Sequence, residues 1–218
     1  MKKKPIIIGA IISLILFIVF ILLATKISTA DGGIYFDLKI ISTIHENINP
    51  AIKNFMIVIS FIGSAKFYYI ISPFLIFYLV RKKHWLELSA LVISILGSVL
   101  LNDLLKLIFA RVRPLEFFLV EQGGFSFPSG HSMNTLSFYG MAAYLFLRNK
   151  RLDSRKALIW IITIVFIGLM GFSRIYLGVH WPTDIIGGFS AGFIWLYICI
   201  LGVEAVNYRN YKKSYKSY

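Results

Sequence analysis

The sequence predicts an all-α, polytopic membrane protein with six transmembrane helices. The chain has 218 residues, of which 58% are hydrophobic and only 15% are charged. Apolar runs of about 20 residues recur along it, and a helix needs roughly that length to cross about 30 Å of hydrocarbon. The runs lack the alternation of barrel strands, and an open sheet edge would leave backbone groups unpaired in lipid. We therefore expect one integral membrane domain, residues 1–218, with no separate soluble module.

The six predicted spans follow the apolar runs in order. The first is longer than the apolar core of a cleaved signal peptide, so we expect it to remain as a span. The second is interrupted by Gly63, Ser64 and Lys66. We expect one long, kinked helix there, because splitting it would reverse the sides of all later loops. The predicted spans cover residues 6–25, 55–80, 86–109, 130–147, 157–177 and 183–203.

The basic residues indicate the topology. A net charge of +13 would also suit a nucleic-acid-binding protein, but these residues lie between the apolar runs rather than together on one surface. Such placement is typical of cytoplasmic loops, so we predict a multi-pass cell-membrane protein with cytoplasmic termini and no nucleic-acid partner. Fifteen of the 23 Lys and Arg residues lie in Lys2–Lys4, Arg81–Lys83, Arg148–Lys156 and Arg209–Lys216.

The loops at 26–54, 110–129 and 178–182 then face the opposite, outer side. Apolar residues recur at helical spacing in the first of them, which fits an interfacial helix lying on the membrane or a partly ordered surface loop. They are Ile34, Leu38, Ile41, Ile44 and Ile48.

Three polar islands fall at this outer side: Lys106–Pro114, Pro128–His131 and Ser173–Asp184. Charged groups are costly near hydrocarbon, so their gathering at span ends indicates a functional site. Because the spans were assigned without reference to these islands, their common side supports one shared site.

The first island ends the third predicted span. Pro114 disfavours helix at Arg113, so the chain should bend and allow Lys106 and Arg113 to point into one pocket. Alternatively, these side chains only anchor the helix end at the membrane surface, and this interpretation fits Arg111 better than Lys106 or Arg113.

The second island precedes the fourth span. Pro128 suits a helix start, where free backbone N–H groups and the positive end of the helix dipole attract anions. Ser129 adds a hydroxyl, and Gly130 allows a phosphate oxygen to approach the backbone closely. The alternative is a capped helix with an incidental His131.

The third island has the pattern of a helix end, a turn and a helix start. Gly178 can end the fifth span and Pro182 can begin the sixth, which places Asp184 in its first turn. From there the carboxylate can reach His180, fix its tautomer and make it a better nucleophile.

Together the islands suit phosphoryl transfer, in which the negative charge of the phosphate must be neutralised. Lys106, Arg113 and Arg174 would hold the nonbridging oxygens. One histidine would attack and the other would handle the proton. A transporter or lipid-binding protein with the same cationic pocket is the alternative from another class.

The motifs Lys106-x6-Arg113-Pro114, Pro128-Ser129-Gly130-His131 and Ser173-Arg174-x5-His180-x3-Asp184 resemble the complete signature of the type 2 phosphatidic acid phosphatase superfamily. The six-span layout resembles its bacterial membrane branch, and residues 121–127 resemble phosphatidylglycerophosphatase-type members. The resemblance implies hydrolysis of a lipid phosphate in the membrane without a metal or other cofactor.

The resemblance also implies a role for each site residue. His180 would attack phosphorus to form a phosphohistidine, and Asp184 would orient it. His131 would protonate the leaving lipid alkoxide and then activate water. The phosphate ligands would be Lys106, Arg113, Ser129, Gly130 and Arg174.

The resemblance suggests phosphatidylglycerophosphate, phosphatidic acid or undecaprenyl diphosphate as substrate. Diphosphatases of this superfamily often carry an acidic residue where Gly130 stands, so we favour a phosphomonoester. The sequence carries no signal for an oligomeric state. We expect His45 and His84 to be surface residues, and we consider Asp103 and Asn102 as candidates to tune Lys106.

Overall fold

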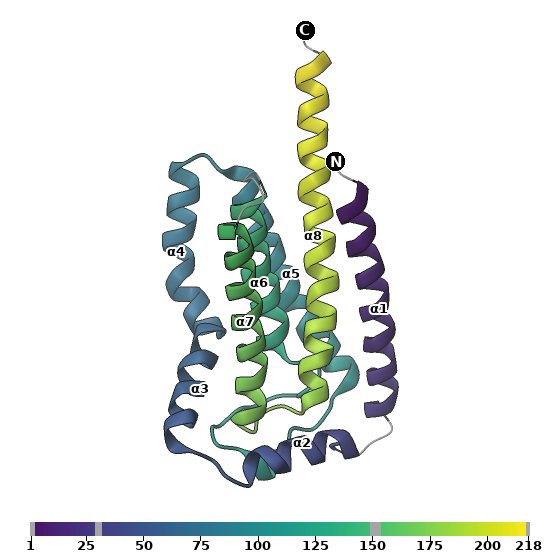
Figure 1. Ribbon diagram of the computed structural model, residues 1–218, viewed down its shortest axis with the longest axis vertical. Helices are drawn as coiled ribbons and strands as arrows, with labels where there is room; N and C mark the ends of the chain where they lie inside the picture. The colour runs from purple at the N-terminus through teal and green to yellow at the C-terminus, as the bar shows by residue number, and fades with distance from the viewer. Residues whose placement is uncertain (1–2, 29–31, 149–153, 217–218) are drawn as a thin grey trace.

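The structure is a computed structural model that describes residues 3–28, 32–148 and 154–216. The described residues are helical apart from turns and loops, and the long helices run side by side as a bundle (Figure 1). Parts of two predicted segments, the first outer loop at 29–31 and the basic loop at 149–153, lie outside the described residues. The helices are α1 (Lys3–Ser28), α2 (Tyr35–His45), α3 (Pro50–Ile62), α4 (Ala65–Arg81), α5 (Trp85–Phe109), η1 (Leu115–Phe117), α6 (Gly130–Leu147), α7 (Ser154–Tyr176) and α8 (Pro182–Lys216).

Four of these helices are long and apolar enough to cross a membrane: α1, α5, α7 and α8. The segment expected to form one long, kinked helix consists of two helices, α3 and α4, bent by 48°, which together are long and apolar enough to form one broken span. Ser64 caps α4 by accepting a hydrogen bond from the Phe67 N–H at 3.3 Å, and the Tyr139 hydroxyl donates to the Ile62 carbonyl at 3.1 Å. Side-chain partners thus satisfy backbone groups that the break frees, which stabilises the bend.

Helix α6 corresponds to the fourth predicted span but is not among the described helices that are long and apolar enough to cross a membrane. It packs against α5, α7 and α8, and two serines of α5 donate hydrogen bonds to it. Ser98 on α5 donates to Asn134 at 2.7 Å, and Ser94 donates to the Ser137 carbonyl at 2.9 Å. Because protein rather than lipid surrounds α6, its hydropathy falls below that of a lipid-facing helix, and the count of six spans remains a prediction.

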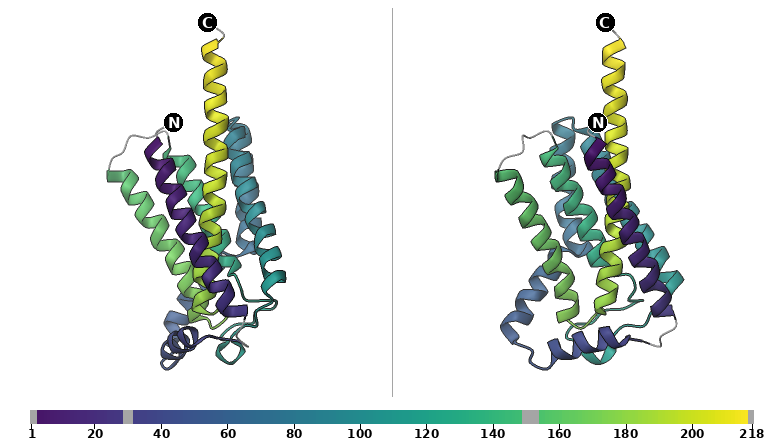
Figure 2. Two further views of the ribbon diagram at one scale, coloured as in Figure 1. Left: turned by 90° about the vertical axis from the view of Figure 1, so that its right-hand side faces the viewer. Right: turned by 45° about the vertical axis from the view of Figure 1, so that its right-hand side comes forward.

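Both described ends of the chain lie at one end of the bundle, together with the α4–α5 connection (Figures 1 and 2). The segment 110–129 and the turn at 178–181 lie at the opposite end. Helix α2 lies crosswise beneath that end, as the interfacial-helix alternative predicted. It buries Asp37 and Ile41 while Tyr35, Phe36 and Leu38 are exposed. The three polar islands are therefore at one end of the molecule.

Candidate active site

His180 and Asp184 form the centre of the polar cluster. Helix α7 ends at Tyr176, Gly178 takes a positive φ of 71° in the turn, and Pro182 begins α8 with Asp184 in its first turn. His180 Nδ1 lies 3.2 Å from Asp184 Oδ2, and the Trp181 N–H donates to the same oxygen at 2.9 Å. The carboxylate only accepts, so Nδ1 carries the proton and Nε2 keeps its lone pair.

Arg113 faces that lone pair. Its Nη1 lies 3.1 Å from His180 Nε2 and donates to the Val179 carbonyl at 2.6 Å. Burial lowers the pKa of Arg113 to about 10, so the guanidinium stays charged at neutral pH. Burial first, and then the nearby cations, hold the pKa of His180 well below its usual 6.5. The imidazole is therefore neutral, as a nucleophile must be. Carbonyl groups of a loop complete the guanidinium's contacts, at Gly123, Gly124 and Phe125.

Arg174 reaches the cluster from the last turn of α7. Its Nη1 donates to the Ser60 hydroxyl, and its Nη2 donates to Gln122 Oε1 at 2.8 Å. Within the described part of the chain, Arg174 Nε is buried without a hydrogen-bond partner. A buried, unpaired N–H on a guanidinium is costly, and a phosphate oxygen is a natural partner for it.

The N-terminus of α6 supplies the second half of the cluster. Ser129 caps the helix by accepting from the Ser132 N–H at 3.4 Å, and its own N–H donates to the Asp184 carbonyl at 3.0 Å. The next residues, Gly130 and His131, are only half-buried. A helix start of this kind presents N–H groups to an anion.

Gly130 stands where a side chain would not fit. A Cβ atom there would lie 2.8 Å from Asn102 Oδ1 and 3.8 Å from Lys106 Nζ, so the Lys106 ammonium is beside the helix start. Asn102 Nδ2 donates to the Pro128 carbonyl at 3.1 Å, which ties α5 to the turn before α6. Of the two residues proposed to tune this region, Asn102 is buried in it, whereas Asp103 is exposed but its charge acts on the Lys106 ammonium.

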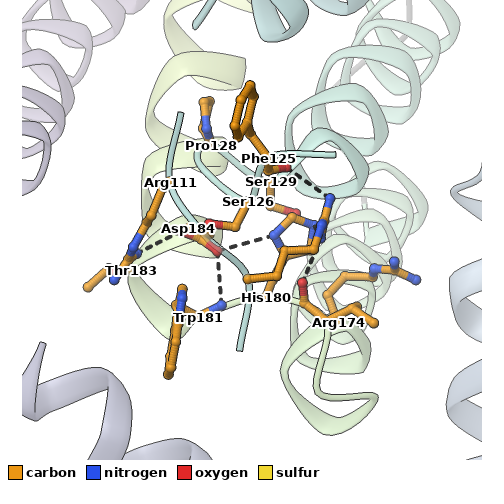
Figure 3. A network of polar contacts seen from close by, with 12 residues as sticks. Arg111, Phe125, Ser126, Pro128, Ser129, Arg174, His180, Trp181, Thr183 and Asp184 are labelled. Atoms are coloured by element: carbon orange, nitrogen blue, oxygen red, sulfur yellow. Dashed lines mark hydrogen bonds and ion pairs between the residues drawn. The ribbon is translucent and has the colours of Figure 1, made fainter. Parts of the chain in front are cut away.

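Arg111 is not a membrane-surface anchor, and this expectation was wrong. Ala110 adopts a left-handed conformation with φ 43° directly after α5, and the chain turns so that Arg111 is 4% exposed. Its Nη1 donates to Asp184 Oδ1 at 2.7 Å and its Nη2 donates to Asp37 Oδ2 at 2.6 Å. Figure 3 shows Asp184 between Arg111 on one side and His180 on the other.

Sequence reasoning missed several residues that hold this cluster in place. Asp37 on α2 accepts from the Thr183 N–H at 2.9 Å, and Gln122 and Ser60 hold Arg174. These contacts join residues that are 52 to 146 positions apart in the chain, so no local sequence pattern predicts them. The sequence offers one hint, the carboxylate of Asp37 among the regularly spaced apolar residues of the first outer loop.

The other two histidines lie apart from this cluster. His84 is exposed at the opposite end of the bundle, where its Nδ1 lies 3.6 Å from Glu87 Oε2. His45 is half-buried rather than a surface residue, because its ring packs edge-on against Phe117 with centroids 5.2 Å apart. Its Nε2 lies 3.3 Å from the Ile175 carbonyl, a contact that ties the end of α2 to the last turn of α7.

The structure thus brings all three islands together. His180 is a neutral, oriented imidazole with cations beside its free nitrogen, and His131 lies within the electrostatic field of His180, Arg174, Lys106 and Arg113. Fixed cations, an oriented imidazole and a second histidine are groups that could bind a phosphoryl group and support its transfer.

Comparison with known proteins shows that the chain is similar to lipid phosphatases. The chain is 36% identical over 200 residues to phosphatidylglycerophosphatase B of Bacillus subtilis (strain 168), covering 87% of this chain and 93% of that protein. It is 29% identical over 199 residues to an undecaprenyl-diphosphatase of Sulfolobus acidocaldarius, covering 88% and 90%. The crystal structure of a transmembrane phosphatidylglycerolphosphate phosphatase from Bacillus subtilis superimposes with a TM-score of 0.79 at 31% identity, covering 89% of this chain and 96% of that one. Residues 87–208 match the sequence profile of the PAP2 superfamily, and the chain belongs to that superfamily.

Proposed function

We propose that this protein is a membrane lipid phosphate phosphatase that hydrolyses a phosphomonoester of the phosphatidylglycerophosphate or phosphatidic acid type. The observation that carries the proposal is the contact of His180 Nδ1 with Asp184. This contact leaves Nε2 without a proton, so its lone pair faces Arg113. Relatives that act on phosphatidylglycerophosphate and on undecaprenyl diphosphate are both similar to this chain, which supports the lipid phosphate class.

The reaction begins when a substrate phosphate oxygen takes the place of His180 Nε2 as a partner of Arg113. Nε2 then attacks phosphorus, the bond between phosphorus and the lipid oxygen breaks, and His131 gives a proton to the leaving alkoxide. Lys106, Arg113 and Arg174 neutralise the nonbridging oxygens, while Ser129 and the Gly130 N–H donate to them. Asp184 holds the resulting imidazolium-like ring in place.

The second half of the reaction restores the enzyme. His131, now neutral, takes a proton from a water molecule that attacks the phosphohistidine. The bond between phosphorus and Nε2 breaks, and inorganic phosphate leaves. All the protein groups that take part in these steps are side chains or backbone N–H groups of the chain, so the reaction needs no metal.

We place the reaction at the extracytoplasmic face. The basic segments Arg81–Lys83 and Arg209–Lys212 lie at the end of the bundle away from His180 (Figures 1 and 2). Positively charged segments favour the cytoplasmic side, so both termini would be cytoplasmic and the site would face outside.

Phosphate release from a panel of lipids tests the proposal. Purified protein in detergent is given phosphatidylglycerophosphate, phosphatidic acid or undecaprenyl diphosphate, each with and without EDTA. We expect metal-independent release that His180→Ala abolishes and that His84→Ala, a change to the exposed histidine at the opposite end, leaves intact. Release from the diphosphate alone would favour a diphosphatase instead. Binding of the lipids without release would favour a transporter.

A further inference from the structure

A buried ion network behind His180 extends to α2, outside the residues that the family profile covers. Arg111 lies between two carboxylates, with Nη1 2.7 Å from Asp184 Oδ1 and Nη2 2.6 Å from Asp37 Oδ2. Both carboxylates are fully buried. The profile begins at residue 87, so Asp37 reaches the site from a separate part of the chain.

Asp37 holds the start of α8 as well as Arg111. Its Oδ1 accepts from the Thr183 N–H at 2.9 Å, and its Oδ2 accepts from the Thr183 hydroxyl at 2.8 Å. Arg111 Nη1 in turn donates to the Thr183 hydroxyl at 2.7 Å. Asp37 therefore contacts Arg111, the ion-pair partner of Asp184, and also Thr183, the residue that precedes Asp184.

This arrangement divides the charge of one guanidinium between two acids. Arg111 favours the charged form of Asp184, but its own positive charge opposes positive charge on His180. Asp37 pairs with the other side of the guanidinium and offsets that positive charge, so Asp184 can stabilise positive charge on His180. Figure 3 shows the near part of this series, from Arg111 through Asp184 to His180.

We propose that Asp37 is a positioning residue for the reaction, which acts through Arg111 and Thr183 to keep Asp184 aimed at His180 and to balance the charge of Arg111. The proposal rests on the proposed function, in which His180 is the nucleophile. The partners of Asp37 are Arg111 and Thr183, neither of which is among the proposed phosphate ligands. A change at Asp37 should therefore lower kcat and leave KM nearly unchanged.

The pH dependence of kcat/KM distinguishes loss of the Asp37 charge from a general loosening of the packing. Loss of the Asp37 charge leaves the surrounding cations less balanced and so favours neutral His180, which moves the acidic limb of kcat/KM to lower pH. Water entering beside a displaced α2 would do the reverse, because solvation favours the charged imidazole. The charged and titratable groups around His180 are Lys106, Arg111, Arg113, His131, Arg174 and Asp184.

The test compares Asp37→Asn with Ile41→Ala, a change to another fully buried α2 residue that is apolar. For Asp37→Asn we expect kcat to fall about 10- to 100-fold, KM to change less than about threefold, and the acidic limb to move to lower pH. For Ile41→Ala we expect a lower Tm, with the acidic limb of the kcat/KM profile at the same pH as in the wild type. Wild-type kcat in Asp37→Asn, or the same limb shift in Ile41→Ala, would overturn the proposal.

A double variant covers the case in which Asp37→Asn does not fold. Asp37→Asn combined with Arg111→Gln removes one acid and one cation, so the net charge of the buried network is unchanged. The cation nearest Asp184 is then gone, so the Asp184–His180 pair takes up a proton more readily, and we expect the acidic limb to move to higher pH than in the wild type, with reduced kcat. A limb at lower pH would overturn the proposal. Absence of turnover in the wild-type protein would instead overturn the proposed function, and this role with it.

Discussion

Replacing Asp184 with asparagine should nearly abolish turnover while preserving the fold. Asp184 accepts from Arg111 through Oδ1 and from His180 and Trp181 through Oδ2. Asparagine offers only one oxygen, and the charged Arg111 competes for it most strongly. The amide NH2 then faces His180 Nδ1. The imidazole must change tautomer to accept from it, which moves the proton to Nε2 beside Arg113 and removes the attacking lone pair.

The size of this effect follows from the lost tautomer. Holding a catalytic histidine in the wrong tautomer costs about 10⁴ in kcat in a serine protease triad, and a factor of 10⁴ corresponds to about 5.4 kcal/mol of barrier. Arg111 keeps Asp37 as a partner, so the variant should still fold. The assay is steady-state phosphate release with Tm measured in parallel. Glu46→Gln, at an exposed carboxylate directly after α2, is the control and should keep wild-type activity. A loss smaller than about tenfold in Asp184→Asn would refute the tautomer argument.

The remaining predictions concern phosphate access, pH and metal. Gly130→Ala should raise KM and lower kcat, because its Cβ would lie 2.8 Å from Asn102 Oδ1, whereas Gly168→Ala, with open space around it, should do neither. Since burial and nearby cations hold the pKa of His180 well below 6.5, protonation of His180 should not lower kcat/KM as pH falls through 6.5 and should lower it only in more acid solution. The unfolded chain takes up this proton near pH 6.5 and the folded chain does not, so stability measured by Tm should also fall below that pH. EDTA should leave turnover unchanged, and abolished turnover would refute the metal-independent reaction.

Much of the site could be predicted because its residues follow local rules. Gly178 and Pro182 place Asp184 in the first turn of α8, and the spacing to His180 then permits the contact that the structure shows at 3.2 Å. Ser129 caps α6 for the same reason, since a serine before a helix accepts from its first turn.

The remaining features depend on contacts between distant parts of the chain. Arg111 was expected at the membrane surface because it follows an apolar run, but the left-handed turn at Ala110 directs it inward to Asp37, 74 positions away. Likewise, the break between α3 and α4 is stabilised by Tyr139 of α6. Neither partner can be recognised from the residues around Arg111 or Gly63 alone.

Trapping the covalent intermediate tests the central claim most directly. Wild-type protein is mixed with phosphatidic acid carrying a radioactive phosphate, quenched in base within one turnover, and digested for peptide mapping by mass spectrometry. We expect an acid-labile, base-stable phosphoryl group on His180 that is absent from His180→Ala. A phosphoryl group on His131, or phosphate release in a single turnover without any labelled histidine, would contradict the account.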